Sequence, residues 1–145
     1  MHFNGLGEQH KFQGWIDKSR AKGYVDRELY RLKRYGSPVT IGLFRSADPN
    51  FAEKFSSYSR MTDHLVPLAE RHYLFLLDHT EISGAVKAVE NLLIHIDSST
   101  DKERVALTQL KEEDDLEGAI KRLLTLFSIA ARSKDVIVED SYLER

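Results

Sequence analysis

Arg60 and Asp63 are a pair whose residue types and spacing could do recognition chemistry. The arginine is always cationic, and its planar fork matches the O6 and N7 acceptors of a guanine base. The carboxylate can accept hydrogen bonds from the N1–H and N2–H donors of guanine. Held on one rigid turn, the two side chains could clamp a guanine nucleotide, and a solvated surface ion pair is the simpler alternative. The same R-x-x-D spacing recurs at Arg45/Asp48 and Arg132/Asp135.

A predicted hairpin follows Asp63 and distinguishes this pair from the other two. Leu65–Leu68 is expected to be a short strand, Ala69–His72 the turn, and Tyr73–Leu77 a strand with large apolar side chains at both parities. A strand that is apolar on both faces lies inside a sheet that is covered on both sides. Arg60 and Asp63 would therefore stand at the head of a rigid hairpin.

The remaining pattern predicts helices and strands that alternate along the chain. The stripe of Val25, Leu29 and Leu32 indicates a helix, with Gly36 as its C-terminal cap. We expect Thr80 to cap the helix that follows the hairpin, and the buried face of this helix to carry Ile82, Val86, Val89 and Leu93. We expect Asp114 or Asp115 to cap a later helix, whose apolar stripe is Leu116, Ile120, Leu123, Phe127 and Ala131. The predicted helices are 24–35, 49–59, 80–96 and a last one from residue 114 or 115, and the further strands are 39–44, 104–110 and 136–138.

The stretch around the hairpin resembles the GGDEF (diguanylate cyclase) family. In that family an R-x-x-D motif is followed by five residues and then by the G-G-D/E-E-F turn. Here five residues, 64–68, separate Asp63 from Ala69-Glu70-Arg71-His72-Tyr73, and Gln13–Lys18 is similar to the family's opening T-G-L-x-N-R segment. The resemblance implies an α/β sandwich of the nucleotidyl cyclase type over residues 13–138. Its central mixed or antiparallel sheet would have about five strands flanked by helices, with a flexible arm at 1–12 and a frayed tail at 139–145.

The resemblance also implies a ligand and the residues that bind it. The family's R-x-x-D site binds the cyclic di-GMP dimer, so Arg60 and Asp63 are candidate ligand-binding residues. The family adds an arginine from the helix after the hairpin, and that position aligns near Asn91 in this chain. Lys87 is the nearest cation, one turn earlier, and Arg71 in the turn is a further candidate. A second subunit could supply the missing donor, which makes a homodimer or an effector protein an expected partner.

The sequence argues against catalysis. Phosphodiester formation from GTP needs carboxylates that hold magnesium on the phosphates. The turn Ala69–His72 has no glycine to let the backbone approach a ligand, and Leu43–Ser46 stands where an active cyclase carries a magnesium aspartate. Asp48, the nearest carboxylate, is a turn residue before Pro49. We expect no catalytic residue and no cofactor, and the scattered histidines show no spacing typical of a metal site.

Bulk composition indicates one soluble globular domain of 145 residues, with 41% apolar and 30% charged residues. A net charge of −2 gives no long-range attraction to nucleic acid polymers or anionic membranes. The absence of cysteine excludes disulfides and thiolate sites, and it fits a cytoplasmic protein. No apolar run reaches the roughly 20 residues that span a bilayer, so we expect no membrane insertion.

Three functions from different classes follow. The first is a catalytically silent cyclic di-GMP receptor that acts through Arg60 and Asp63 to control assembly or a partner protein. The alternative is a protein-interaction or dimerisation module that binds no nucleotide. The third is a divergent cyclase, which would have to turn over GTP with magnesium. Only the receptor should lose ligand when Arg60 is removed from a folded chain.

Overall fold

A computed structural model describes residues 18–96 and 103–144 of the chain. The expected arm over residues 1–12, the opening segment Gln13–Asp17 and the loop Asp97–Thr100 lie outside the described residues. The helices and strands are α2 (Lys18–Tyr35), β1 (Val39–Arg45), α3 (Phe51–Tyr58), β2 (His64–Ala69), β3 (His72–Asp78), α4 (Ile82–Ile94), β4 (Arg104–Gln109), α5 (Leu116–Ser133), β5 (Ile137–Glu139) and the 3-10 helix η2 (Asp140–Glu144). This order confirms the predicted succession, although α2 begins earlier than expected.

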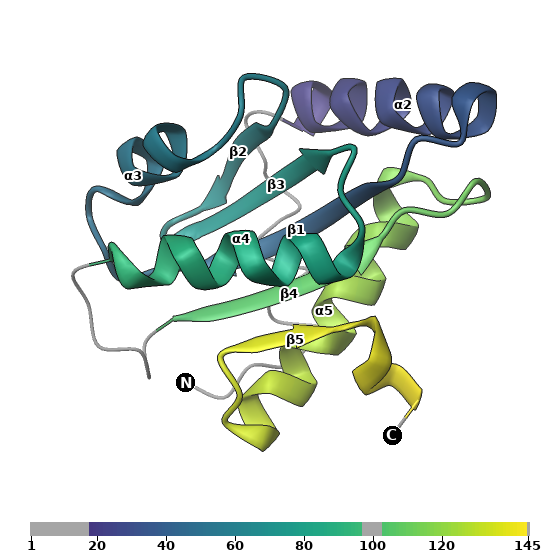
Figure 1. Cartoon of the computed structure of the whole chain (residues 1–145). Helices are drawn as coiled ribbons and strands as arrows, with labels where there is room; N and C mark the ends of the chain where they lie inside the picture. Colours follow the sequence, from purple (N-terminus) through teal and green to yellow (C-terminus); the bar gives the residue numbers. More distant parts are fainter. Residues whose placement is uncertain (1–17, 97–102, 145) are drawn as a thin grey trace.

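The five strands form one sheet in the order β2-β3-β1-β4-β5. Neighbouring strands are antiparallel except for β4 and β5, which are parallel. The sheet is therefore mixed, and Figure 1 shows helices on both of its faces. This confirms the predicted fold class of an α/β sandwich. Among the described helices, none is both long enough and apolar enough to cross a lipid bilayer.

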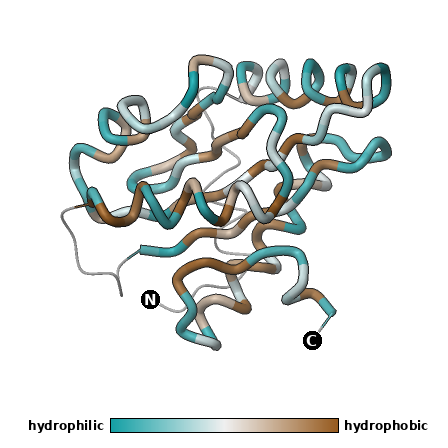
Figure 2. The backbone as a smooth tube through the Cα atoms, in the orientation of Figure 1, coloured by the Kyte–Doolittle hydropathy of each residue, from teal (hydrophilic) through white to brown (hydrophobic). Residues whose placement is uncertain are grey.

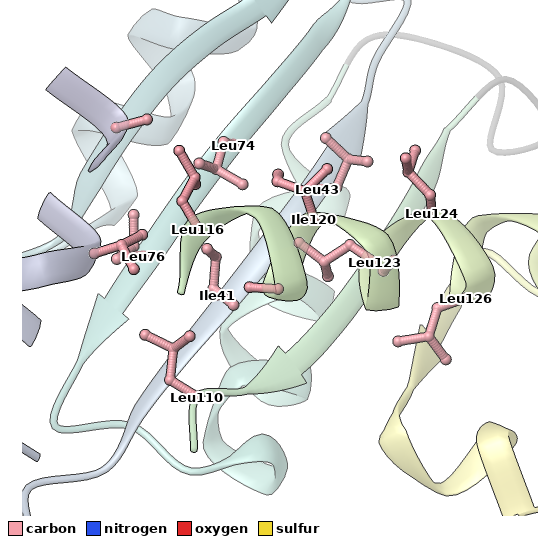
Figure 3. Close-up of a cluster of buried hydrophobic side chains, with 14 of the residues drawn as sticks. Ile41, Leu43, Leu74, Leu76, Leu110, Leu116, Ile120, Leu123, Leu124 and Leu126 are labelled. Atoms are coloured by element: carbon pink, nitrogen blue, oxygen red, sulfur yellow. The ribbon is translucent and has the colours of Figure 1, made fainter. Parts of the chain in front are cut away.

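The central strands carry apolar side chains on both faces of the sheet, because helices cover each face. Ile41, Leu43, Leu74 and Leu76 point toward α2 and α5, and α5 packs its leucines directly onto them (Figure 3). Phe44, Phe75, Val105 and Leu107 point the other way, toward α3 and α4. The hydropathy colouring of the backbone shows apolar residues along the central strands and at intervals along the helices (Figure 2). The two apolar layers fix the register of the hairpin strands, since a slip by one residue would exchange their faces.

Two sequence predictions about this packing were wrong. In α5 the buried position is Ala130, whereas Ala131 is exposed, because the buried stripe turns with the helix's 3.6-residue period. In place of a frayed tail, Asp140–Glu144 forms η2. The Asp140 carboxylate anchors it by accepting hydrogen bonds from Thr108 Oγ1 at 2.5 Å and from the Gln109 backbone N–H at 3.0 Å.

The predicted helix ends are confirmed for α2 and α5. Gly36 has a φ of +69°, and its N–H donates to Leu32 O at 2.9 Å. A left-handed residue after a helix is a common C-terminal cap that glycine adopts without steric cost. At the start of α5, the Asp115 carboxylate accepts from the Gly118 N–H at 2.7 Å.

Replacing Asp115 by alanine should lower the free energy of unfolding by about 1 kcal/mol, since the first turn of α5 loses its capping acceptor. Urea denaturation would measure the change. Asp115→Asn is the matched control because asparagine caps about equally well. A loss of the same size in both variants would mean that the charge, and not the cap, stabilises α5.

Candidate functional site

The turn from Arg60 to Asp63 connects α3 to β2 and is closed by its own two end residues. The Asp63 N–H donates to Arg60 O at 3.0 Å. In return, the Arg60 N–H donates to Asp63 Oδ2 at 2.9 Å, and Arg60 Nη2 lies 3.3 Å from Asp63 Oδ1. The R-x-x-D spacing therefore folds the turn on itself and brings its cation and anion into contact.

The Arg60 guanidinium is fixed at one end and exposed at the other. Its Nη2 also donates to the carbonyl oxygen of Asp78 and to Thr80 Oγ1, the latter at 2.6 Å. The side chain as a whole is 54% exposed. Among the described residues, no acceptor takes a hydrogen bond from Nε or Nη1. The group is thus held in direction while part of its donor edge faces solvent.

Asp63 orients Arg60 and is itself buried, with a side chain that is 4% exposed. Its Oδ1 accepts from the Asp78 N–H at 3.2 Å as well as from Arg60. Both carboxylate oxygens are therefore engaged within the protein. This arrangement differs from the expectation that Asp63 would face a ligand directly.

Thr80 anchors the site to the sheet and does not cap α4, so the predicted cap was wrong. The Thr80 hydroxyl accepts a hydrogen bond from Arg60 Nη2 and donates one to Asp78 O at 2.7 Å, and it is therefore unavailable to cap the helix. Its backbone is tied to β1, because the Thr80 N–H donates to Pro38 O at 3.1 Å and Thr40 Oγ1 donates to Thr80 O at 2.8 Å. The N-cap of α4 is Glu81, which makes no side-chain capping hydrogen bond. The first N–H groups of α4 are left without a side-chain cap.

A groove with a volume of about 630 Å³ opens between this turn and α4. This volume lies within the range of small-molecule sites. Asn91 lines the groove, and Lys87 is exposed on α4 but is not among the lining residues. The lining residues are Pro38, Tyr58, Arg60, Asp63, Leu77, His79, Thr80, Glu81, Ser83, Gly84, Ala88 and Asn91.

Arg71 lies away from this groove, at the opposite end of the hairpin. The strand β2 separates the two places, because it begins directly after Asp63 and ends at Ala69. Arg71 occupies the tight turn with a φ of +64°, and its carbonyl accepts from the Ser46 N–H at 3.0 Å. Six strand residues at about 3.3 Å each put roughly 20 Å between the turn and the head of the hairpin. The structure therefore does not bring Arg71 to the candidate site.

The other carboxylates with R-x-x-D spacing have local structural partners. Asp48 lies in a turn, as predicted, and the structure buries it there: it accepts from the Asn50 N–H at 2.8 Å and from Lys54 Nζ at 2.7 Å. Asp135 accepts from the Tyr142 hydroxyl at 3.0 Å. Neither carboxylate lines the groove.

Asp78 and Glu28 are site residues that sequence reasoning missed. Asp78 ends β3 with its side chain 3% exposed, and its backbone holds both Arg60 and Asp63. Glu28 is 2% exposed on the inner face of α2 and neighbours the Asp78 carboxyl. A carboxylate directly after an apolar strand was the available signal for Asp78, and a glutamate beside the apolar stripe of α2 was the signal for Glu28.

Comparisons with known proteins place the fold. No family model matches the sequence, and no curated protein matches it. Among solved structures, the GGDEF domain of YfiN from Pseudomonas aeruginosa is similar with a TM-score of 0.73 at 12% identity, over 87% of this chain and 96% of that chain. The GGDEF domain of DgcB from Caulobacter crescentus, solved in complex with c-di-GMP, gives 0.65 at 6% identity over 84% and 89%.

The diguanylate cyclase SiaD from Pseudomonas aeruginosa, solved in complex with its activator SiaC, gives a TM-score of 0.69 at 13% identity. That match covers 85% of this chain and 58% of the SiaD chain, so this chain spans little more than half of SiaD. Similarity at these identities concerns the fold alone. The fold is that of GGDEF domains, as the resemblance around the hairpin implied.

Proposed function

We propose that this GGDEF-like domain is a catalytically silent receptor that binds cyclic di-GMP in the groove headed by Arg60. The observation that carries the proposal is the guanidinium of Arg60. It is fixed by Asp63, Asp78 and Thr80, and it remains 54% exposed at the rim of a groove of about 630 Å³. A donor that is oriented before the ligand arrives loses little entropy on binding.

The donor edge of Arg60 suits a guanine base. Nη2 carries two N–H groups, whereas three protein acceptors lie within its reach, so one of these contacts can be exchanged for a ligand oxygen. Together with Nη1, it would then pair bidentately with guanine O6 and N7. In this proposal Asp63 positions the arginine, and the arginine contacts the base.

The groove also offers partners for the rest of the dinucleotide. The start of α4, at Ser83 and Gly84, has no side-chain cap, and its N–H groups and helix dipole favour a phosphate. The Tyr58 ring stacks on His95 with centroids 4.1 Å apart, and Tyr58 is 50% exposed, which leaves part of its ring for a base. Asn91 supplies an amide with both donors and acceptors. Lys87, one helical turn before Asn91 and one turn after Ser83, would add positive charge near the phosphates.

A calorimetric titration panel tests this assignment. Cyclic di-GMP should bind saturably, and cyclic di-AMP should bind at least about 10-fold more weakly, because adenine presents a donor where guanine presents the O6 acceptor. Equal affinity for the two dinucleotides would contradict recognition by Arg60. Absence of heat up to high micromolar cyclic di-GMP would contradict the receptor proposal altogether.

The same proposal includes the absence of cyclase activity. The tight turn of the hairpin is formed by Glu70 and Arg71, without glycine, where the family has its signature. Asp48, the first carboxylate after β1 along the chain, is held by Lys54 and the Asn50 N–H, and the Glu103 carboxylate near the same strand end accepts from the Ala47 N–H at 2.9 Å. Incubation with GTP and magnesium should therefore release no pyrophosphate and form no cyclic di-GMP. Turnover would support the divergent-cyclase alternative.

Adding an arginine on α4 should strengthen binding. Asn91→Arg places a second guanidinium in the groove, at the position where the family resemblance implies one, and we expect cyclic di-GMP affinity to rise about 10-fold. Calorimetry measures the change. Glu90→Arg is the matched control, because it adds an arginine to the exposed surface of the same helix outside the groove. An equal gain in both variants would indicate general charge attraction.

A protein-interaction module is the second candidate, and exposed apolar side chains favour it. Met61 is fully exposed, Ile94 is 77% exposed, and Tyr58 is 50% exposed. Such a module predicts concentration-dependent self-association in analytical ultracentrifugation. Met61→Lys should weaken this association while Arg60→Ala leaves it unchanged, and association that requires added cyclic di-GMP would favour the receptor.

A further inference from the structure

Two acidic side chains are buried against each other directly behind the Arg60 site. Glu28 belongs to α2 and Asp78 ends β3, and their side chains are 2% and 3% exposed. One cation serves both, because Arg31 Nη1 lies 3.5 Å from Glu28 Oε1 and 3.3 Å from Asp78 Oδ2. Glu28 Oε2 is buried, and in the part of the chain that the structure describes no donor reaches it. Among the described residues, Arg31 is thus the one cation within ion-pair distance of both carboxyl groups, and its side chain is 41% exposed.

This arrangement favours one proton held between the two carboxyl groups. Two carboxylates side by side in a buried place repel each other, and each loses hydration. A proton on Glu28 removes one charge and supplies the hydrogen bond between the acids. Burial first, and then the hydrogen bond and charge of Asp78, raise the pKa of Glu28 to about 7, while Arg31 and Arg27 oppose the rise.

The backbone of Asp78 connects this pair to the site. Its N–H donates to Asp63 Oδ1 at 3.2 Å, and its carbonyl accepts from both Arg60 Nη2 and Thr80 Oγ1. The residue that carries one of the two buried carboxyl groups thus also holds the orienting carboxylate and the exposed guanidinium. A shift of the Asp78 side chain away from Glu28 would move the hydrogen-bond partners of Arg60.

Other charged groups around the pair come from three places. From α2, Arg27 faces Glu28 together with Arg31. From β2, Asp63 and His64 lie close to Asp78, and the pKa of His64 is lowered by burial and by Arg27. After β3, the exposed His79 has its Nε2 3.8 Å from Asp78 Oδ2.

We propose that Glu28 and Asp78 are a proton-sharing positioning pair for Arg60. This inference rests on the proposed function. With one proton shared, the pair holds the Asp78 backbone where it orients Arg60 and Asp63. When the Glu28 carboxyl releases that proton to solvent, repulsion between two carboxylates loosens the Asp78 segment, and the affinity for cyclic di-GMP falls. Binding should therefore weaken as the pH rises through neutrality.

The test titrates the full chain with cyclic di-GMP between pH 6 and pH 8. Wild-type affinity should fall about 10-fold over this range. Glu28→Gln, whose amide imitates the protonated acid, should bind tightly at both pH values. Asp26→Asn is the matched control because Asp26 is an exposed acid of the same helix, paired with Lys22 at 2.7 Å, and it should keep the wild-type slope. An unchanged slope in Glu28→Gln would overturn the proposal.

A second readout needs neither ligand nor variant. Carbon-13 NMR of the carboxyl groups should show Glu28 titrating near neutral pH, with the amide signals of Asp78 and Thr80 following the same midpoint. The urea midpoint should also fall as the pH rises toward 7, because the folded chain keeps a proton that an unfolded glutamate has already lost. A titration midpoint for the Glu28 carboxyl in the ordinary range of glutamate would overturn the proposal of a proton-sharing pair. If the pair titrates as expected and no cyclic di-GMP binds, the proposed function fails by itself.

Discussion

Replacing Arg60 by alanine is expected to weaken cyclic di-GMP binding about 100-fold, which corresponds to roughly 3 kcal/mol. The variant removes the bidentate donor for guanine O6 and N7, a contact that is worth about 1–3 kcal/mol, and it removes a positive charge from the groove. The fold should remain, because Arg60 is an exposed residue of a surface turn. Calorimetric titration gives the affinity, and urea denaturation checks the stability.

Two further variants make this result specific. Arg132→Ala removes an exposed arginine that belongs to another R-x-x-D spacing, outside the groove, and it should bind like wild type. Arg60→Lys keeps the charge but loses the planar fork, so its affinity should lie between those of wild type and Arg60→Ala. An Arg60→Ala variant that is folded and binds with wild-type affinity would exclude the groove as the guanine site.

Replacing Gly42 by alanine should lower the free energy of unfolding by about 3 kcal/mol or more. Gly42 lies in the middle of β1, opposite Phe75 of β3, and a Cβ added there would lie 2.2 Å from Phe75 Cζ. The ring cannot move away easily, because it is 1% exposed and packs against Phe55 at a centroid distance of 5.7 Å and Phe44 at 6.2 Å. The alanine therefore displaces either a core ring or a central strand.

Urea denaturation of three chains measures this effect. Gly23→Ala is the matched control because nothing lies within 4 Å of a Cβ at this helical position, and it should be neutral or stabilising by up to about 1 kcal/mol. Gly42→Ala combined with Phe75→Leu should recover part of the loss, since the smaller side chain makes room. A wild-type midpoint for Gly42→Ala alone would contradict the account of the core.

Much of the fold could be predicted because its signals are periodic. The apolar residues of Tyr73–Leu77 at both parities placed this strand between two helical layers, and the structure confirms this. Gly36 caps the end of α2 and Asp115 caps the start of α5, as expected, because helix capping depends on local backbone groups. The order of the strands in the sheet and the parallel pairing of β4 with β5 depend on long-range contacts that no local pattern encodes.

The details of the site were less predictable because they depend on competition between partners. Thr80 has the residue type and position of an N-cap, yet its hydroxyl contacts Arg60 and the Asp78 carbonyl. Asp63 was expected to face a ligand, and it is instead buried under the arginine that it orients. Asp140 anchors η2 by accepting hydrogen bonds from Thr108 and Gln109 of β4. The charged C-terminal residues gave no signal for these contacts, because their partners lie 32 and 31 residues earlier in the chain.

The positions of Arg71 and Lys87 show a limit of reading sites from sequence distance. Arg71 is close to Arg60 along the chain, but a two-stranded hairpin separates its turn from its open end by the full length of a strand. On α4, a turn of helix separates Lys87 from Asn91, and of these two residues only Asn91 lines the groove. Asn91 shares the groove face with Gly84 and Ala88, at the spacing of one helical face.

The most direct measurement is an NMR titration of the nitrogen-15-labelled domain with cyclic di-GMP. We expect saturable shifts for Arg60, including its side-chain Nε–H, and for Thr80, Ser83 and Asn91 around the groove. Arg71 and Arg132 should stay unchanged, because they lie outside the groove. Saturable shifts confined to the hairpin turn around Arg71, or no shifts at millimolar ligand, would contradict the claim that the groove headed by Arg60 binds cyclic di-GMP.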